Sequence, residues 1–429
     1  MATPRGKITQ TPRRLNVNFW KYWIGQTISN LGSSITLFAL PLLVYKLTGS
    51  ALNLGISSAA NMLPYLLFGL ILGAWVDRVD RKRMMVLMDI GRAAVIATIP
   101  LLAWFGQLNV WWIYAIGFLH STLTICFETG EFAAIPSLVD QDNLVTANGR
   151  IQASYSAASI LGPVLAGALV AIVPLASLLL LDAFSFLASA FSIWLVTISF
   201  NKRNEESGER KHILRDVREG LRFVWGHPVL RNISLMMALV NFVMATTGAQ
   251  LVLFAKERLQ ASDTQVGLLF MAGSAGVVVL ALLAGLLRKR WTFSRVALGA
   301  LMFMGVFTLA LALIRLYWLA LIFEALEQGC GILFNINTGS LRQAIVPNHL
   351  LGRIMSIASV VAWSAIPLGA FLGGLLIDRT GNVALVYGII GVLTILIPLA
   401  FALTPLGHAE RYLPKKDAIE AETAIPHAG

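Results

Sequence analysis

The sequence predicts an all-α integral membrane protein of twelve transmembrane helices, arranged as two six-helix bundles with both termini in the cytoplasm. Hydrophobic residues make up 57% of its 429 positions and charged residues only 13%, which is too apolar a balance for a chain folded in water. The apolar residues fall in long uninterrupted segments, and the basic residues gather in every second loop between them. These observations predict a multi-pass membrane protein.

The apolar segments set the number of helices, since a helix needs about 20 mostly apolar residues to cross the hydrocarbon of a bilayer. Twelve segments meet this requirement, at 17–47, 52–76, 84–105, 110–138, 144–173, 175–200, 229–255, 263–287, 293–315, 317–346, 351–377 and 382–404. Cys126 and Cys330 lie inside separate segments, so we expect no disulfide, no metal site and no cofactor.

The basic residues orient the chain, because Lys and Arg concentrate in cytoplasmic loops. With the N-terminus inside, 27 of the 33 Lys and Arg residues are cytoplasmic; five are outside and Arg92 lies within the third segment. The charge of +11 is thus explained by membrane flanks, and a nucleic-acid partner is not expected.

A polar linker at 201–228 divides the chain into an N-terminal segment at 1–16, a bundle at 17–200, a second bundle at 229–404 and a tail at 405–429. Short motifs recur in the same order in both bundles: Thr129-Gly130, Ile135-Pro136 and Gly149-Arg150-Ile151, then Thr338-Gly339, Val346-Pro347 and Gly352-Arg353-Ile354. This weak repeat indicates a duplication. Within the linker, Leu214, Val217, Leu221, Val224 and Trp225 recur at helical spacing, which predicts an amphipathic helix at the inner interface or, alternatively, a solvated spacer.

The loop after the second segment carries a cluster of charges, Asp77-Arg78-Val-Asp80-Arg81-Lys82-Arg83 preceded by Gly73. It resembles the major facilitator signature Gly-x-x-x-Asp-Arg-x-x-Arg-Arg. The resemblance implies that Asp77, Arg78 and Arg81 form an inner latch between the bundles. In the third segment Asp89 and Arg92 are three residues apart and are expected to form a structural pair tied to this latch.

A second motif lies in the fifth segment, Gly162-Pro163-Val-Leu-Ala166-Gly167. It resembles the antiporter motif Gly-Pro-x-x-Gly-Gly of exporting major facilitators, with Ala166 in place of one glycine. Small residues allow close helix approach and proline loosens the backbone, which suits a helix at a moving seam. Generic close packing is the alternative.

Further matches extend over nearly the whole chain: Trp23-Ile-Gly25-Gln26, Arg218-Glu-Gly220-Leu-Arg222 and Ser340-Leu-Arg342-Gln343. Together they resemble the macrolide-efflux and enterobactin-export branch of the major facilitators. The resemblance implies a protein of the bacterial cytoplasmic (inner) membrane that exports its substrate from the cytoplasm. It also implies that an ion gradient drives export, with protons or another cation as the coupling partner, and members of this branch carry unlike substrates.

Polar residues recur on the first, fourth, seventh and tenth segments, which line the central cavity in this family. The expected cavity residues are Gln26, Asn30, Phe38, His120, Thr124, Phe127, Asn241, Gln250 and Asn335. The aromatic members suit a bulky amphipathic compound, either drug-like or macrolide-like.

Acids within a span are costly, so each is a functional candidate. The candidates for proton coupling are Glu128, Glu131, Glu324 and Glu327. Glu128 is our first choice, Glu131 is also assigned to the latch as a partner of Arg78 and Arg81, and a structural role is open for each. Asp182 stands alone in an apolar run and receives no role.

The sequence contains no Gly-x-Ser-x-Gly elbow, His-Glu-x-x-His or phosphate loop, so neither an enzyme nor an ATP-driven pump is predicted. We expect a monomeric transporter that contacts only its small-molecule substrate, the coupling cation and lipid. Siderophore export, lysophospholipid transport, uptake, and a membrane assembly or signalling protein without transport are the alternatives.

Overall fold

The computed structural model describes residues 15–76, 79–140, 143–201, 221–346 and 348–412, and the regular elements within these ranges are all helical. The first half contains α1 (Val17–Thr48), α2 (Ala51–Val76), α3 (Arg81–Trp104), α4 (Val110–Leu138), α5 (Leu144–Leu169), the short η2 (Leu175–Leu178) and α6 (Leu179–Trp194). The second contains α8 (Pro228–Leu253), η3 (Phe254–Arg258), α9 (Asp263–Arg290), α10 (Phe293–Leu313), α11 (Tyr317–Ile345), α12 (Asn348–Trp363), α13 (Ala365–Thr380), α14 (Val383–Ala402) and η4 (Pro405–Tyr412).

Local capping sequences fix where many of these helices begin and end. The side chains of Asn16 and Asp80 accept hydrogen bonds from the first turns of α1 and α3, and Ser262 with Gln265 forms a capping box at the start of α9. Gly49 ends α1 with a positive φ of 59°, a conformation that glycine adopts without steric cost.

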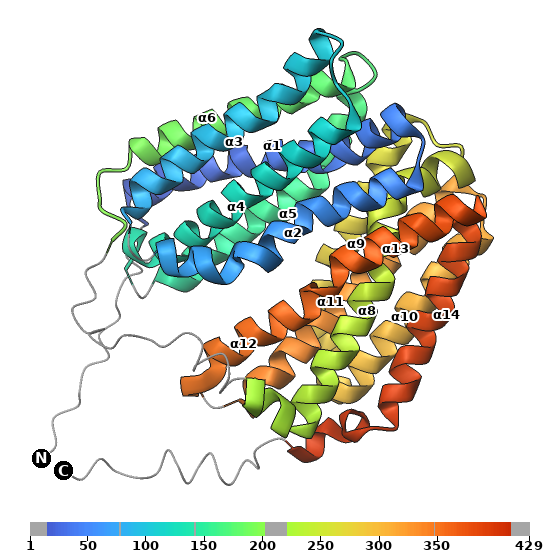
Figure 1. The fold of residues 1–429 in the computed structure, drawn as a ribbon. Coiled ribbons are helices and arrows are strands. Elements are labelled where there is room, and N and C mark those ends of the chain that lie inside the picture. The colour runs from blue at the N-terminus through green and yellow to red at the C-terminus, as the bar shows by residue number, and fades with distance from the viewer. Residues whose placement is uncertain (1–14, 77–78, 141–142, 202–220, 347, 413–429) are drawn as a thin grey trace, which may run out of the picture.

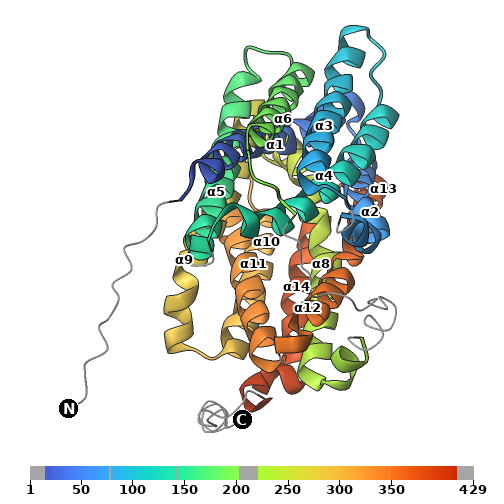
Figure 2. The same cartoon turned by 90° about the vertical axis from the view of Figure 1, so that its left-hand side faces the viewer.

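The helices form two bundles, one of α1–α6 and one of α8–α14, which are separate in the perpendicular views of Figures 1 and 2. The bundles meet chiefly where α2 packs on α13 and where α5 packs on α9. Besides these two seams, apolar packing such as that of Phe38 of α1 on Phe270 of α9 continues the buried core from one bundle into the other.

Both seams are tightest at one end of the molecule, which we call the closed end: the end where α1 and α5 finish and α2 and α9 begin. Here Thr264 donates to the Gly167 carbonyl at 2.7 Å and Gln250 donates to the Ala51 carbonyl at 2.7 Å. The opposite end, where α1, α3 and α8 begin, we call the open end; the ribbons of the two bundles diverge toward it in Figure 1. Between described residues, no hydrogen bond or ion pair joins the bundles there.

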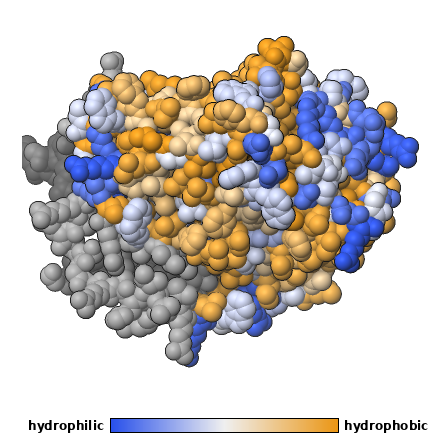
Figure 3. Space-filling view, turned by 45° about the horizontal axis from the view of Figure 1, so that its top comes forward, coloured by the Kyte–Doolittle hydropathy of each residue, from blue (hydrophilic) through white to orange (hydrophobic). Residues whose placement is uncertain are grey.

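Eleven helical segments of the described chain are long and apolar enough to cross a membrane. Large apolar side chains project from them, including Leu282 and Trp318, which are 77% and 70% exposed. Figure 3 shows this apolar surface across the middle of one face, with hydrophilic residues gathered toward its ends. The molecule is therefore a multi-pass membrane protein.

Two predicted segments differ in detail from the observed helices. The helix predicted at 351–377 is broken at Ser364 into α12 and α13, because Pro367 has no N–H to donate to the carbonyl of Trp363. The segment predicted at 175–200 starts as the 3-10 turn η2 and is helical only to Trp194. Of the expected linker helix, residues 221–226 are helical, while Leu214 and Val217 lie outside the described residues.

Candidate substrate cavity and buried carboxylates

A cavity of about 540 Å³ lies between the bundles, within the size range of small-molecule sites. Most of its wall comes from α1, α2, α3 and α4, and α8 and α9 contribute Gly248, Ala249 and Phe270. Its polar lining groups are the side chains of Ser33, Thr36, Ser57, Ser58, Asn61, Tyr65, His120, Ser121 and Thr124. A largely apolar site with scattered hydroxyl and amide groups suits an amphipathic ligand.

The fourth predicted segment supplies the cavity residues that its spacing suggested. His120 and Thr124 are one helical turn apart on α4 and both line the cavity. Thr124 donates to the His120 carbonyl at 2.9 Å, and Glu128 follows one turn further along the same face. The stripe therefore runs from the cavity toward the open end.

Most of the other expected cavity residues lie elsewhere, because their polar groups are used in helix packing. Gln26 is buried and donates to Ser189 Oγ at 2.7 Å, Asn241 donates to the Ala362 carbonyl and Gln250 donates to Ala51. Phe38 and Phe127 are core side chains, 0% and 2% exposed. Asn30 is half-buried and Asn335 is exposed, and neither lines the cavity.

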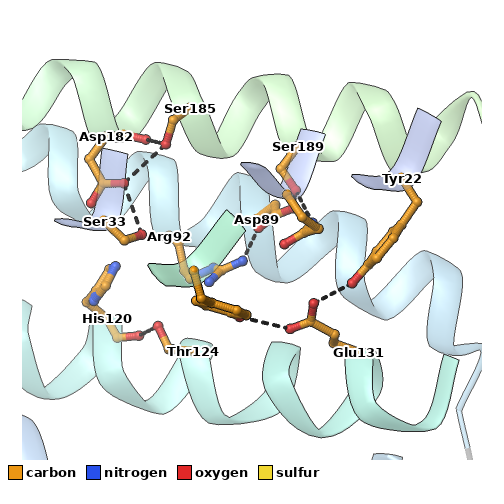
Figure 4. A network of polar contacts seen from close by, with 12 residues as sticks. Tyr22, Ser33, Asp89, Arg92, His120, Thr124, Glu131, Asp182, Ser185 and Ser189 are labelled. Atoms are coloured by element: carbon orange, nitrogen blue, oxygen red, sulfur yellow. Dashed lines mark hydrogen bonds and ion pairs between the residues drawn. The ribbon is translucent and has the colours of Figure 1, made fainter. Parts of the chain in front are cut away.

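Asp89 and Arg92 of α3 form a buried ion pair within the first bundle (Figure 4). Ser189 of α6 donates to Asp89 Oδ2 at 2.6 Å, and the Arg92 guanidinium lies 4.0 Å from the Phe127 ring centre and 4.4 Å from that of Phe186. Such an enclosed pair with additional partners holds helices in register at the expense of desolvation. It joins α3 to α6 and makes no contact with the second bundle.

The two acids of α4 have different surroundings. Glu131 is 7% exposed and accepts hydrogen bonds from the Tyr22 hydroxyl at 2.5 Å and the Tyr155 hydroxyl at 3.3 Å. Tyr22 of α1 lies beside it in Figure 4, and Tyr155 belongs to α5. The expected pairing of Glu131 with Arg78 and Arg81 stays a prediction, because Arg78 lies outside the described residues. Glu128 is exposed and accepts one hydrogen bond, at 3.1 Å, from Tyr65, a cavity-lining residue.

The two acids of α11 are enclosed in the second bundle. Glu324 is 4% exposed and accepts a hydrogen bond from Gln328 at 3.1 Å. Glu327 is 2% exposed, and neither of its carboxylate oxygens has a hydrogen-bond partner. Neither residue lines the cavity.

Of the expected latch, Asp77 and Arg78 lie outside the described residues. Arg81 begins α3, where its backbone N–H donates to Asn201 Oδ1 at 3.0 Å and its guanidinium contacts the Phe200 carbonyl at 3.5 Å. These contacts stay within the first bundle.

The Gly162-Pro163-x-x-Ala166-Gly167 motif lies at the seam between α5 and α9. A Cβ on Gly267 of α9 would be 2.5 Å from the Pro163 carbonyl oxygen, and one on Gly167 would be 3.1 Å from the Thr264 carbonyl oxygen. A Cβ on Gly162 would instead meet Ser34 of α1 at 2.4 Å. The motif therefore brings the backbones of the two bundles into contact at the closed end.

Asp182 of α6 is the residue that sequence reasoning left without a role. It is 0% exposed and accepts hydrogen bonds from Thr36 and Ser33 of α1, two residues of the cavity wall. The signal in the sequence was its isolation in an apolar run. Among the described residues, no group of three or more His, Cys, Asp and Glu side chains is arranged to hold a metal ion.

Comparison with known proteins places this geometry in a family. The model of the transmembrane secretion effector family, a branch of the major facilitators, matches residues 9–424. The chain belongs to this family. Its resemblance to major facilitator efflux transporters is thereby confirmed, and the transmembrane secretion effector family groups it with transporters rather than enzymes.

Relatives named as efflux pumps align with most of the chain. It is 24% identical to macrolide efflux protein A of Streptococcus pyogenes over 368 residues, which cover 85% of this chain and 90% of that protein. It is 29% identical to the multidrug efflux pump Tap of Mycolicibacterium fortuitum over 363 residues, or 82% of this chain and 87% of that one.

Solved structures share the fold at low sequence identity. The nucleoside transporter NupG superposes with a TM-score of 0.73 at 11% identity, covering 90% of this chain and 98% of that one. An inward-facing, unoccupied bacterial homologue of the human lysosomal transporter Spinster superposes with a TM-score of 0.72 at 14% identity, covering 94% and 98%.

Proposed function

We propose that the protein is a secondary active transporter that exports a bulky amphipathic small molecule in exchange for protons by alternating access. The observation that carries this proposal is a central cavity between two bundles whose direct contacts lie at one end. Rocking the bundles about the cavity would open the closed end and close the open one. A wall that is mostly apolar, together with efflux pumps among the relatives, supports a drug-like or macrolide-like substrate.

The proposed orientation puts the open end, and with it both termini, in the cytoplasm. Basic residues support this, since the helix ends at the open end carry Arg81, Lys82, Arg83, Arg150, Arg288, Lys289, Arg290 and Arg295. The closed end carries fewer, namely Lys46, Lys256, Arg258, Arg315 and Arg379. The bias agrees with the positive-inside rule for a protein of a bacterial inner membrane.

The proposed count of twelve spans adds α5 to the eleven apolar helices. Its 26 residues would extend about 39 Å at 1.5 Å per residue, enough to cross the hydrocarbon. Its polar residues are tolerable in a membrane because α1 and α9 pack against it. One chain supplies the whole cavity wall, so we propose that a monomer is the working unit.

Coupling to protons is proposed from the number of carboxylates enclosed in the bundles. Glu131, Glu324 and Glu327 are buried and form no ion pair with a described Lys, Arg or His, and Glu128 lies between the cavity and the open end. The free-energy cost of burying a carboxyl group in such surroundings is lowest when the group is protonated and therefore uncharged. Loss and uptake of a proton would then bias the exchange between the two states.

The test is transport in proteoliposomes whose lumen is acidic, with radiolabelled erythromycin and a panel of other macrolides, siderophores and lysophospholipids. We expect at least one compound to accumulate to a higher level than in protein-free liposomes, which serve as the control for passive trapping of basic compounds. This accumulation should be lost when nigericin collapses the pH gradient. Glu128→Gln should lower the rate, whereas the matched change Gln107→Glu in an exposed loop should not. The proposal fails if no compound shows gradient-dependent accumulation and Glu128→Gln behaves like the unchanged protein.

A further inference from the structure

Asp182 is a fully buried carboxylate in the first bundle with no basic side chain in ion-pairing distance among the described residues. It lies near the start of α6, a helix whose other fifteen residues carry no charge. An unpaired carboxylate in such a place is strongly disfavoured unless it is neutralised. The question is what neutralises it.

The neighbouring charges are already engaged. On α3, Arg92 is paired with Asp89 and covered by two aromatic rings. On α1, the charged residues Lys21 and Lys46 contact the Leu195 carbonyl and Asp263 at opposite ends of the helix. Among the described residues, His120 of α4 is a further titratable group on this side of the bundle; its ring lies 5.6 Å from that of Phe186, and its Nε2 has no hydrogen-bond partner.

The surrounding oxygens indicate where a proton is needed. Thr36 donates to Asp182 Oδ2 at 2.6 Å. The Ser33 and Ser185 hydroxyls lie 3.3 Å and 3.2 Å from Oδ1 (Figure 4). Ser185 has a single hydroxyl proton, and its shorter contact, at 2.8 Å, is with the backbone carbonyl of Asp182. When Ser185 donates its proton to the Asp182 backbone carbonyl, a lone pair of Ser185 Oγ faces Asp182 Oδ1. Two acceptor oxygens would then repel each other. A proton on Oδ1 converts this contact into a hydrogen bond from Oδ1 to Ser185.

The packing of α1 against α6 creates this pocket. A Cβ on Gly32 would lie 2.2 Å from Ser185 Oγ and 2.8 Å from Asp182 Oδ1, so only glycine admits the serine and the carboxyl together. Ser33 and Thr36, which contact the carboxyl, also line the central cavity. Asp182 is thus one hydroxyl removed from the space that a substrate would occupy.

We propose that Asp182 is the residue that binds the coupling proton, and that Ser33 and Thr36 link its protonation to occupation of the cavity. In the substrate-free state Oδ1 carries the proton and donates it toward Ser185. When the substrate engages the hydroxyls of α1, the proton passes from Oδ1 to water at the open end, leaving a carboxylate stabilised by Thr36. This assignment deepens the proposed function and rests on it.

The test uses purified full-length protein in weakly buffered detergent with a pH indicator, and erythromycin as the probe. The unchanged protein should release protons when erythromycin binds. Asp182→Asn keeps an acceptor for Thr36 and should bind erythromycin within threefold of the unchanged affinity, without releasing protons and without dependence on pH. In proteoliposomes Asp182→Asn should retain counterflow and lose accumulation driven by the pH gradient. The control Gln107→Glu, in an exposed loop, should release protons like the unchanged protein.

Thr36→Val provides a second test if Asp182→Asn does not yield monodisperse protein. It removes the 2.6 Å hydrogen bond and should shift the midpoint of the pH dependence of accumulation by about one pH unit. Thr124→Val, which removes a cavity hydroxyl bonded to its own helix, should not shift it.

The outcomes separate this inference from the proposed function. Gradient-driven accumulation by Asp182→Asn, or proton release equal to that of the unchanged protein, overturns the assignment to Asp182 and leaves proton antiport standing. A midpoint in Thr36→Val identical to that in Thr124→Val also overturns it. Failure of the unchanged protein to respond to a pH gradient, or a requirement for sodium instead, overturns the proposed function itself.

Discussion

The closed end and the open end of the molecule are built differently, although the same helices reach both. At the closed end, polar contacts cross between the bundles: Lys46 pairs with Asp263, and Ser50 donates to Asp378 at 3.2 Å. At the open end, the hydrogen bonds that Asn201 forms with the Arg81 N–H and the Val79 carbonyl stay within one bundle. Each bundle is therefore secured internally, and the polar contacts that join the two bundles, among the described residues, lie at the closed end.

The closed end is also weak enough to open. Its polar contacts are a few hydrogen bonds, worth about 1 kcal/mol each, and a partly exposed ion pair worth about 1 kcal/mol or less. Close glycine contacts and apolar packing, such as that of Phe38 on Phe270, accompany them. A difference of a few kcal/mol between two states is the range that ligands and protons can shift. By contrast, the buried Asp89–Arg92 pair lies inside one bundle, where it would not have to break.

The largest expected effect comes from crowding the seam between α5 and α9. Gly267→Val places side-chain atoms against the Pro163 carbonyl, 2.5 Å from the position of the added Cβ. Overpacking of this kind costs about 1–3 kcal/mol, so we expect the closed end to fail to form and the accumulation rate to fall by about tenfold or more.

The matched control is Gly285→Val in the same helix, because a Cβ there meets no atom within 4 Å. Proteoliposome transport and gel filtration measure rate and folding. Equal rates for the two variants would show that the α5–α9 seam does not carry the closed state.

A smaller effect is expected from the ion pair at the closed end. Asp263→Asn removes the charge that faces both Lys46 and Lys256, and should raise the population of the state open to the outside by two- to fivefold. The measurement is labelling of Phe270→Cys, which lies in the cavity wall, by a membrane-impermeant thiol reagent added outside cells, with Cys126 and Cys330 replaced by Ala. Asp80→Asn, which alters the Asp80–Arg83 pair within one bundle, is the control. Equal labelling of both variants would contradict the view that the ion pair between the bundles stabilises the closed end.

The smallest effect is expected at the open end, where Glu410 of η4 accepts hydrogen bonds from the Ser294 N–H at 2.8 Å and hydroxyl at 2.9 Å. Partial burial opposes ionisation, but the Ser294 hydrogen bonds outweigh it and hold the pKa of Glu410 below its usual range. The carboxylate therefore adds stability above its ordinary pKa, and this is lost as pH falls through the lowered value.

Glu410→Gln should accordingly reduce stability by about 0.5–1 kcal/mol at pH 7, with a smaller difference near pH 4. Thermal melting in detergent at both values measures it. Because this contact lies within one bundle, labelling of the introduced Cys at position 270 should not change. A change in labelling would mean that the open end also sets the balance between states.

The sequence was sufficient for features that depend on neighbouring residues. The first helix was predicted at 17–47 and runs from Val17 to Thr48, because lipid requires an uninterrupted apolar helix. Helical spacing also placed His120 and Thr124 on one face of α4, and both line the cavity.

Features that depend on packing could not be read in the same way. Asp182 meets Thr36, which is 146 positions away, and Glu131 meets Tyr22, which is 109 positions away. Hydropathy indicates that a polar residue lies within a membrane span. It does not indicate which neighbouring side chain forms a hydrogen bond with that residue. Gln26 is a second example. One face of α1 packs on α6 and another lines the cavity, and the Gln26 amide donates to Ser189 of α6.

The central claim is that the two ends exchange their roles during transport. Spin labels at Gln107 and Arg315 report the closed end, and labels at Asp140 and Trp291 report the open end, in protein lacking both native cysteines. Double electron–electron resonance with and without erythromycin, at pH 8 and pH 5, should show the first distance lengthening whenever the second shortens. Two distances that stay fixed, or that change in the same direction, would contradict alternating access in this protein.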